Sequence, residues 1–202
     1  MNDGRAAIQD RWQDELNQAA RVVDGIRATL DQVERVADSL IGVLAAGGCV
    51  FACGNGGSAL AAQHFTAELV AHFRRERPPV RGIALTADAG LLTAIANDHD
   101  FEQIFSRQVR GLVTNRDALL AFSTSGRSPN ILTAVQAACD IGAKTVAFTG
   151  GDGGKLAGMV DHALVVREPE TARIQEGHLI LIHLICEHID AAFSPQRVHA
   201  EP

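Results

Sequence analysis

The sequence lacks the features of several large classes of protein. Cysteine occurs only four times in 202 residues and never with the CxxC spacing typical of metal-binding and redox motifs. No apolar run reaches the ~18 to 20 residues that cross a bilayer, and the N-terminus has neither the basic start nor the apolar stretch of a signal peptide. The formal net charge is −6, so the excess of positive charge typical of nucleic-acid-binding proteins is missing too. We therefore expect a cytoplasmic protein with no membrane and no nucleic-acid partner.

One small group of basic residues is present. Arg74, Arg75 and Arg77 follow a helical pattern. Because cations are favoured near the C-terminus of a helix, we interpret the group as a solvated helix end. The composition is otherwise that of a folded globular chain, 47% hydrophobic and 21% charged, and its length fits one domain with a substantial core.

The N-terminal part has the pattern of a long helix. Proline is absent from Ile8 to Leu44, and apolar residues recur there at steps of three and four, which predicts an amphipathic helix that Gly25 kinks or divides. A compact domain of about 150 residues cannot bury so long a stripe, so we expect residues 1–46 to pack partly against another copy of the chain. The alternative is a pair of shorter helices folded back on one domain.

From residue 47 onwards, short apolar runs alternate with helical patterns. The runs lack the polar alternation of a half-exposed strand, which is typical of parallel strands covered on both faces. We predict an α/β fold with a doubly wound five-stranded parallel sheet, flavodoxin-like, flanked by helices over 47–194 and followed by a flexible tail, 195–202. The predicted strands are 49–53, 82–85, 118–122, 145–148 and 163–166, and the predicted helices are 58–75, 89–96, 101–113, 129–141, a short one after Gly154, and 171–193.

Ligands of such sheets bind beyond the carboxyl ends of the strands, where two loops stand out. The first runs from Gly54 through Asn55, Gly56 and Gly57 to Ser58. Its glycines allow positive φ and close approach of a ligand, although it has neither the GxGxxG spacing nor the Walker ending. A tight turn without a ligand is the alternative interpretation.

The second loop is rich in hydroxyl groups. Ser128 is placed as the N-cap of a helix that begins at Pro129 and that Gly142 ends. Directed donors at a positive helix end suit a phosphate monoester, whereas a plain turn remains the alternative. The hydroxyls expected to converge here belong to Ser123, Thr124, Ser125 and Ser128.

Two groups of acidic and imidazole side chains could carry out chemistry. His64 and Glu68 are spaced i and i+4 on the helix after the glycine loop, which we expect to place them near the same rim. The last helix carries the second group, Gln175, Glu176, His178, His183, Glu187 and His188. A carboxylate with an imidazole suits enediol proton transfer between an aldose and a ketose. His64, Glu68, Gln175 and His183 could also hold zinc.

Helix geometry limits the metal hypothesis. On a straight helix, Gln175 and His183 are about 12 Å apart along the axis, too far for one ion. Either the helix begins after Gln175 or the two side chains serve one site from different subunits. Elsewhere, Asp100 is expected to cap a helix, and Asn97 and Asp98 to accept sugar hydroxyls.

Taken together, these residues resemble the sugar isomerase (SIS) domain family, and within it most closely the phosphoheptose isomerases. The resemblance covers about residues 12–193. It is carried by CGNGGSA at 53–59, QHFTAEL at 63–69, AIANDHDF at 94–101, STSGRS at 123–128, TGGDGGKLA at 149–157 and RIQEGHLILIH at 173–183.

The resemblance implies conversion of sedoheptulose 7-phosphate to glycero-manno-heptose 7-phosphate, a step towards the heptose of bacterial surface glycans. It makes Glu68 the base and His183 its acid-base partner, with one zinc per subunit on His64, Glu68, Gln175 and His183. It also implies a homotetramer with sites between subunits. The substrate-binding residues would be Asn55, Gly56, Gly57, Ser58, Glu68, Asn97, Asp98, Ser123, Thr124, Ser125, Ser128 and Gln175.

The chain departs from the family pattern at Ala61, His72, Arg127 and Ala172, where relatives carry aspartate, arginine, asparagine and aspartate in turn. These differences leave the sugar itself open. Alternative hypotheses are a non-catalytic SIS protein that binds a replication initiator, an isomerase of another sugar phosphate, and a sugar-phosphate-sensing module.

Overall fold

The protein is described by a computed structural model over residues 2–195, so most of the predicted tail, 196–202, lies outside the described residues. Its centre is one parallel sheet of five strands in the order β2-β1-β3-β4-β5. This order confirms the predicted doubly wound sheet. The strands are β1 (Val50–Gly54), β2 (Gly82–Ala84), β3 (Ala118–Ser123), β4 (Lys144–Gly150) and β5 (His162–Val166).

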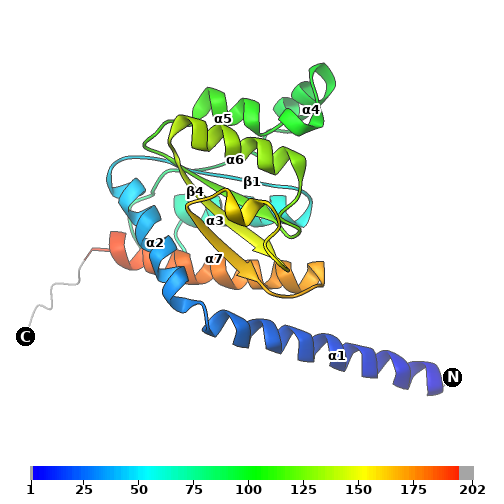
Figure 1. Ribbon diagram of the computed structural model, residues 1–202. Helices are drawn as coiled ribbons and strands as arrows, with labels where there is room; N and C mark the ends of the chain where they lie inside the picture. Colours follow the sequence, from blue (N-terminus) through cyan, green and yellow to red (C-terminus); the bar gives the residue numbers. More distant parts are fainter. Residues whose placement is uncertain (1, 196–202) are drawn as a thin grey trace, which may run out of the picture.

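Helices cover both faces of this sheet (Figure 1). One face carries α4, α5 and α6, and the other carries α2, α3, α7 and the end of α1. The helices are α1 (Asn2–Arg27), α2 (Leu30–Ala45), α3 (Gly57–Val70), α4 (Ala89–Asp98), α5 (Ser106–Leu112), α6 (Pro129–Ile141) and α7 (Thr171–Phe193), with short 3-10 turns η1 (Phe101–Gln103) and η2 (Leu156–Gly158). None of the helices within residues 2–195 is long and apolar enough to cross a membrane.

Two apolar cores lie on opposite sides of the sheet, because successive residues of a strand point to opposite faces. In β3, Leu120 and Phe122 belong to the core beneath α3 and α7, and Leu119 and Ala121 belong to the core beneath α5 and α6. All residues of β3 are buried, which explains why the strand reads as a continuous apolar run.

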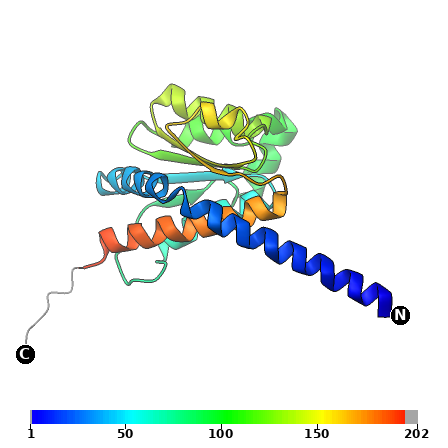
Figure 2. The same cartoon turned by 60° about the horizontal axis from the view of Figure 1, so that its bottom comes forward.

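The N-terminal pattern forms two helices, which divide at residues 28–29 rather than at Gly25. The Thr29 hydroxyl donates to the Ile26 carbonyl oxygen at 2.9 Å at the end of α1. The following helix, α2, packs its buried face into the core, whereas the start of α1 projects away from the domain (Figures 1 and 2). Trp12 and Leu16 of α1 are 64% and 65% exposed.

The helix predicted over 58–75 ends earlier, at Val70, for a tertiary reason. The next residues turn around the buried carboxylate of Asp190 on α7, which accepts hydrogen bonds from the amides of Phe73, Arg74 and Arg75. The predicted solvated helix end is therefore wrong for Arg77, which is buried and paired with Asp190. The helix predicted over 101–113 is likewise divided, into η1 and α5.

Candidate active site

The two predicted ligand loops meet at the carboxyl edge of the sheet. Asn55 in the glycine loop and Asn130 in α6 join them through reciprocal side-chain hydrogen bonds of 2.9 and 2.8 Å. The side-chain amide of Asn55 is therefore hydrogen-bonded to the first turn of α6. Gly56 has a positive φ of 54° at the start of α3. Sequence reasoning missed Asn130, whose only signal is its place in the first turn after Pro129.

The hydroxyls of the second loop are arranged around the start of α6. Ser128 occupies the N-cap position, but its hydroxyl makes no capping hydrogen bond and lies 3.2 Å from the Ser123 hydroxyl. Because the hydroxyl does not occupy the helix end, this positive end stays available to an anion. The structure thus supplies hydroxyls and a helix N-terminus at one place.

This loop rests on the turn after β4. Gly126, with φ 61°, accepts a hydrogen bond from the Leu156 amide through its carbonyl oxygen, and Gly154 packs against its backbone. Arg127 forms an exposed ion pair of 2.8 Å with Asp152, and its hydrogen bond lowers the pKa of Asp152 to about 2. Arg127, one of the departures from the family pattern, therefore links two loops at the surface.

Gln175 lies beside the glycine loop of the same chain. A side chain at Gly57 would come within 2.8 Å of the Gln175 amide carbon and oxygen, so the two residues are in close contact. The helix α7 begins at Thr171, before Gln175. This excludes the alternative in which the helix starts after Gln175 and bends it towards His183.

Two imidazoles and a carboxylate meet further along α3 and α7. The Nε2 atoms of His64 and His183 are 3.0 Å apart, and the Glu68 carboxylate lies 3.6 Å from His64 Nε2. The ring of Phe73 stacks on His183 with 5.0 Å between centroids. The structure therefore brings together the predicted base and its predicted partner, with His64 between them. We call His64, Glu68 and His183 the acid-base cluster.

The surroundings of His183 favour its neutral form. Partial burial is the main cause that lowers the pKa of His183, and the neighbouring His64 and Arg74 lower it further while Glu68 acts in the opposite direction. A neutral imidazole has one nitrogen that can accept a proton and one that can donate. His183 can thus serve as a general acid and base near neutral pH.

Within one chain, however, the cluster is distant from the phosphate loops. Two contacts between α3 and α7 mark the separation: Gly57 meets Gln175 at the rim, and His64 meets His183 further down. Gly57 and His64 are seven residues apart on α3, and Gln175 and His183 are eight apart on α7. At a rise of 1.5 Å per residue, the two contacts are about 10 to 12 Å apart along the helices. The prediction that His64 and Glu68 lie near the rim of their own chain is wrong, because the helix carries them away from it.

Other predicted residues are dispersed. Asn97 and Asp98 are exposed at the end of α4, on the other face of the sheet from α3 and α7, and their side chains hydrogen-bond to each other at 2.8 Å. Asp100 accepts from the Glu102 amide and caps η1, as predicted. His178 does not join the cluster, since it is fully buried against Phe122 and Phe148.

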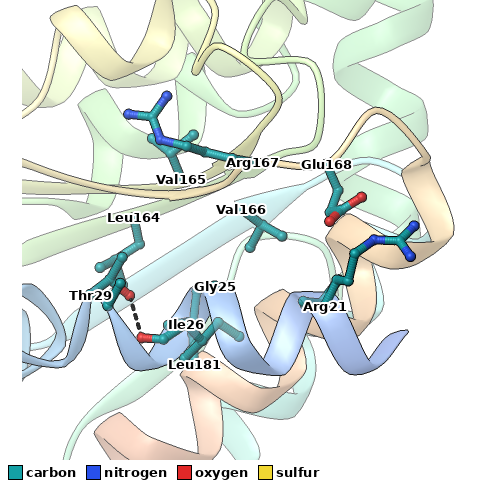
Figure 3. A pocket seen from close by; sticks show the side chains of 12 residues that line it. Arg21, Gly25, Ile26, Thr29, Leu164, Val165, Val166, Arg167, Glu168 and Leu181 are labelled. Carbon is teal, nitrogen blue, oxygen red and sulfur yellow. Dashed lines mark hydrogen bonds between the residues drawn. The ribbon is translucent and has the colours of Figure 1, made fainter. Parts of the chain in front are cut away.

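A cavity of about 410 Å³ between α1 and β5 is separate from this site (Figure 3). Its wall is largely apolar, with Arg21, Arg167 and Glu168 among its lining residues. None of the predicted catalytic, substrate-binding or metal-binding residues lines it. The acid-base cluster instead lies at the surface, with the side chains of His64 and Glu68 36% and 20% exposed.

The same cluster contains the side chains predicted to bind metal, apart from Gln175. Across residues 2–195, no group of three or more His, Cys, Asp or Glu side chains is arranged as a metal site. The donor types of His64, Glu68 and His183 nevertheless fit zinc, which binds imidazole nitrogen and carboxylate oxygen. Two such nitrogens on one tetrahedral ion are about 3.3 Å apart, close to the spacing of His64 and His183.

Comparisons with known proteins show which family the chain is similar to. A family model described as SIS domain matches residues 14–150. The phosphoheptose isomerase of Aromatoleum aromaticum is 46% identical over 180 residues, which are 87% of this chain and 91% of that protein. The solved phosphoheptose isomerase of Neisseria gonorrhoeae superposes with a TM-score of 0.86 at 40% identity, covering 91% and 99% of the two chains. That of Francisella tularensis gives 0.87 at 40% identity, covering 90% and 97%.

Proposed function

The chain belongs to the phosphoheptose isomerase family of SIS-domain proteins, and on this premise we propose that it converts sedoheptulose 7-phosphate to glycero-manno-heptose 7-phosphate in the cytoplasm. It is an aldose-ketose isomerase. The single observation that carries the mechanism is the meeting of Glu68 and His183 through His64. The relatives bear the name of an enzyme, which does not favour the alternative of a non-catalytic protein.

The reaction needs only proton transfers. The Glu68 carboxylate removes the proton from C1 of the ketose, next to the C2 carbonyl, and returns it to C2 of the enediol. His183 moves the hydroxyl proton from O1 to O2, so that the carbonyl forms at C1. No proton is gained or lost overall. The lowered pKa of His183 keeps its imidazole neutral and ready for this exchange.

The phosphate is bound at the other end of the site. Hydroxyls of Ser123, Thr124, Ser125 and Ser128 with the glycine-loop amides hold the dianion, helped by the start of α6. Gln175 contacts the sugar beside the glycine loop, and Asn97 and Asp98 reach it from the end of α4. The assignment of the two loops and Gln175 is supported by their shared rim.

The complete site is built from more than one copy in a homotetramer. One chain alone leaves about 10 to 12 Å between its loops and its acid-base cluster, which a second copy can close by presenting its own cluster to them. The surface around the cluster supports this, because apolar side chains of α3 and α7 are exposed there, as on an uncovered interface. They are Leu60 (67%), Val70 (51%), Leu179 (43%) and Leu184 (38%).

One zinc ion per subunit completes the cluster. His64, Glu68 and His183 would hold it, and Gln175 would come from another copy because its own helix places it too far away. A bound zinc ion would supply Lewis-acid polarisation of substrate oxygen. Elemental analysis of purified protein should find zinc in the wild type and much less in His64→Ala. Equal metal content in both would reject the site.

The substitution Glu68→Gln tests the catalytic role. It removes the base but keeps the shape of the side chain, so kcat should fall by about 10² to 10⁴. Binding of sedoheptulose 7-phosphate, measured by calorimetry, should remain. Glu76→Gln is a matched control, since Glu76 is an 89% exposed carboxylate eight residues away. Equal loss of binding and turnover in Glu68→Gln would show that Glu68 is structural instead.

A further inference from the structure

A buried ion pair lies behind the acid-base cluster. Asp190 on α7 and Arg77 have fully buried side chains, and Arg77 Nε donates to Asp190 Oδ1 at 2.7 Å. Asp190 also accepts from the amides of Phe73, Arg74 and Arg75 at 3.2, 2.6 and 2.9 Å. Burial alone would raise the pKa of Asp190, but these hydrogen bonds outweigh it and hold the pKa below its usual range, so the carboxylate stays charged.

The guanidinium of Arg77 reaches the end of the helix that carries Glu68. Its Nη2 donates to the carbonyl oxygen of Glu68 itself at 2.8 Å, and its Nη1 donates to that of Leu69 at 2.9 Å. The last carbonyls of a helix have no partner within the helix, so these hydrogen bonds fix the final turn of α3. One side chain thus holds the backbone of Glu68 and the carboxylate of Asp190 together.

The segment wrapped around Asp190 reaches His183 as well. Residues 71–77 carry Phe73, whose ring stacks on the His183 imidazole with an interplanar angle of 17°. Arg74 in the same segment lies over Phe73 at 4.8 Å and pairs with Glu187 of α7 at 2.6 Å. The backbone amides that position Phe73 and Arg74 are those held by Asp190.

Stability alone is a poor explanation for this pair. Desolvation makes a buried ion pair no more stabilising than well-packed apolar residues of the same volume, although removing one partner is costly. The pair instead fixes positions. Arg77 holds the backbone of Glu68, and Asp190 holds the segment whose Phe73 ring stacks on His183. We infer that Arg77 and Asp190 are positioning residues that set the Glu68–His183 arrangement for proton transfer. The inference rests on the proposed roles of Glu68 and His183.

The test compares three variants. Asp190→Asn weakens the hydrogen bonds that hold residues 71–77 around the Asp190 carboxylate. Phe73→Leu removes only the ring that stacks on His183. Asp117→Asn is the control, because Asp117 is also a buried carboxylate that accepts from backbone amides, those of Cys49 and Thr114, but at the amino end of the sheet. For each variant, the kcat and KM for sedoheptulose 7-phosphate, the melting temperature and the NMR signal of the His183 ring would be measured.

Asp190→Asn and Phe73→Leu should lower kcat by about 10- to 100-fold, as for a displacement near 1 Å, with KM little changed. Both should shift the His183 ring signal, since the ring current of Phe73 is lost or moved. Asp117→Asn should lower the melting temperature while leaving kcat, KM and the ring signal unchanged. A fourth variant, Arg77→Lys, should also lower kcat, because lysine lacks the fork that reaches several acceptors.

Unchanged kcat and ring signal in Phe73→Leu would overturn the inference, even if Asp190→Asn fails to fold. So would an Asp117→Asn variant that loses kcat to the same extent as Asp190→Asn. Failure of the proposed function looks different: the wild type itself would then show no turnover of sedoheptulose 7-phosphate, while the ring signal of His183 in the variants would still report whether Asp190 positions it.

Discussion

Replacing Gly126 should damage the phosphate loop through a defined displacement. A Cβ at this position would lie 2.7 Å from the carbonyl carbon of Gly153 and closer still to its oxygen. Ordinary carbon contacts are about 3.5 to 4.0 Å, so the loops after β3 and β4 must separate by about 1 Å. A misplacement of about 1 Å can cost 10²-fold in rate, which corresponds to about 2.7 kcal/mol of transition-state stabilisation. We expect this loss of kcat/KM in Gly126→Ala.

Gly151→Ala is the matched control. Gly151 has the same φ of 61°, but a Cβ there would meet no atom within 4 Å. Both variants therefore carry the left-handed backbone cost of about 1 to 2 kcal/mol in stability, measured by urea unfolding. Only Gly126→Ala should also lose kcat/KM in a coupled isomerase assay. Equal kinetics in the two variants would refute the argument that packing between these loops sets the phosphate site.

Two further predictions concern buried groups. Burial lowers the pKa of His178 to about 4, so between pH 6.5 and 4 the unfolded chain binds a proton that the folded chain does not. The free energy of unfolding should therefore keep its full value above pH 6.5 and fall by about 3 kcal/mol towards pH 4. Urea unfolding of the wild type and of His178→Gln should show different slopes of this free energy against pH. Parallel curves would contradict the prediction. Cys139 is the exposed cysteine, and burial raises the pKa of Cys49 to about 11 and of Cys53 to about 12. Ellman's reagent should then label one thiol in the folded protein, lost in Cys139→Ser, and fast labelling of a second would contradict the burial.

Much of the fold could be predicted from the sequence because burial leaves a local pattern. The strands of the sheet are largely apolar, and the helix 129–141 was predicted at its true bounds because Pro129 and Gly142 mark its ends. The early end of α3 could not be predicted in this way. It depends on the contact between Arg77 and Asp190, which are 113 residues apart in the chain. A local pattern contains no information on such a partner.

The candidate site was predictable in its residue types and in the spacing of Gln175 and His183 along α7, but not in which side chains meet across the fold. Helical periodicity places His64 and Glu68 on one side of α3, and the structure brings His183 to them across 119 residues. The distance from the cluster to the phosphate loops follows from the seven residues of α3 and eight of α7 that separate them, which the prediction of a shared rim for His64 and Glu68 did not take into account. Asn130 was missed because its partner, Asn55, lies 75 residues away.

Mixing two inactive variants tests the composite site most directly. Glu68→Gln loses the base, and Gly126→Ala damages the phosphate loop, so each should be nearly inactive alone. The proposed site takes its cluster from one copy and its loops from another. Unfolding the two variants and refolding them as a mixture should therefore create some sites that carry neither substitution. About a quarter of the wild-type activity should return for random pairing. Activity no greater than the sum of the two separate variants would show that each site is built from a single chain.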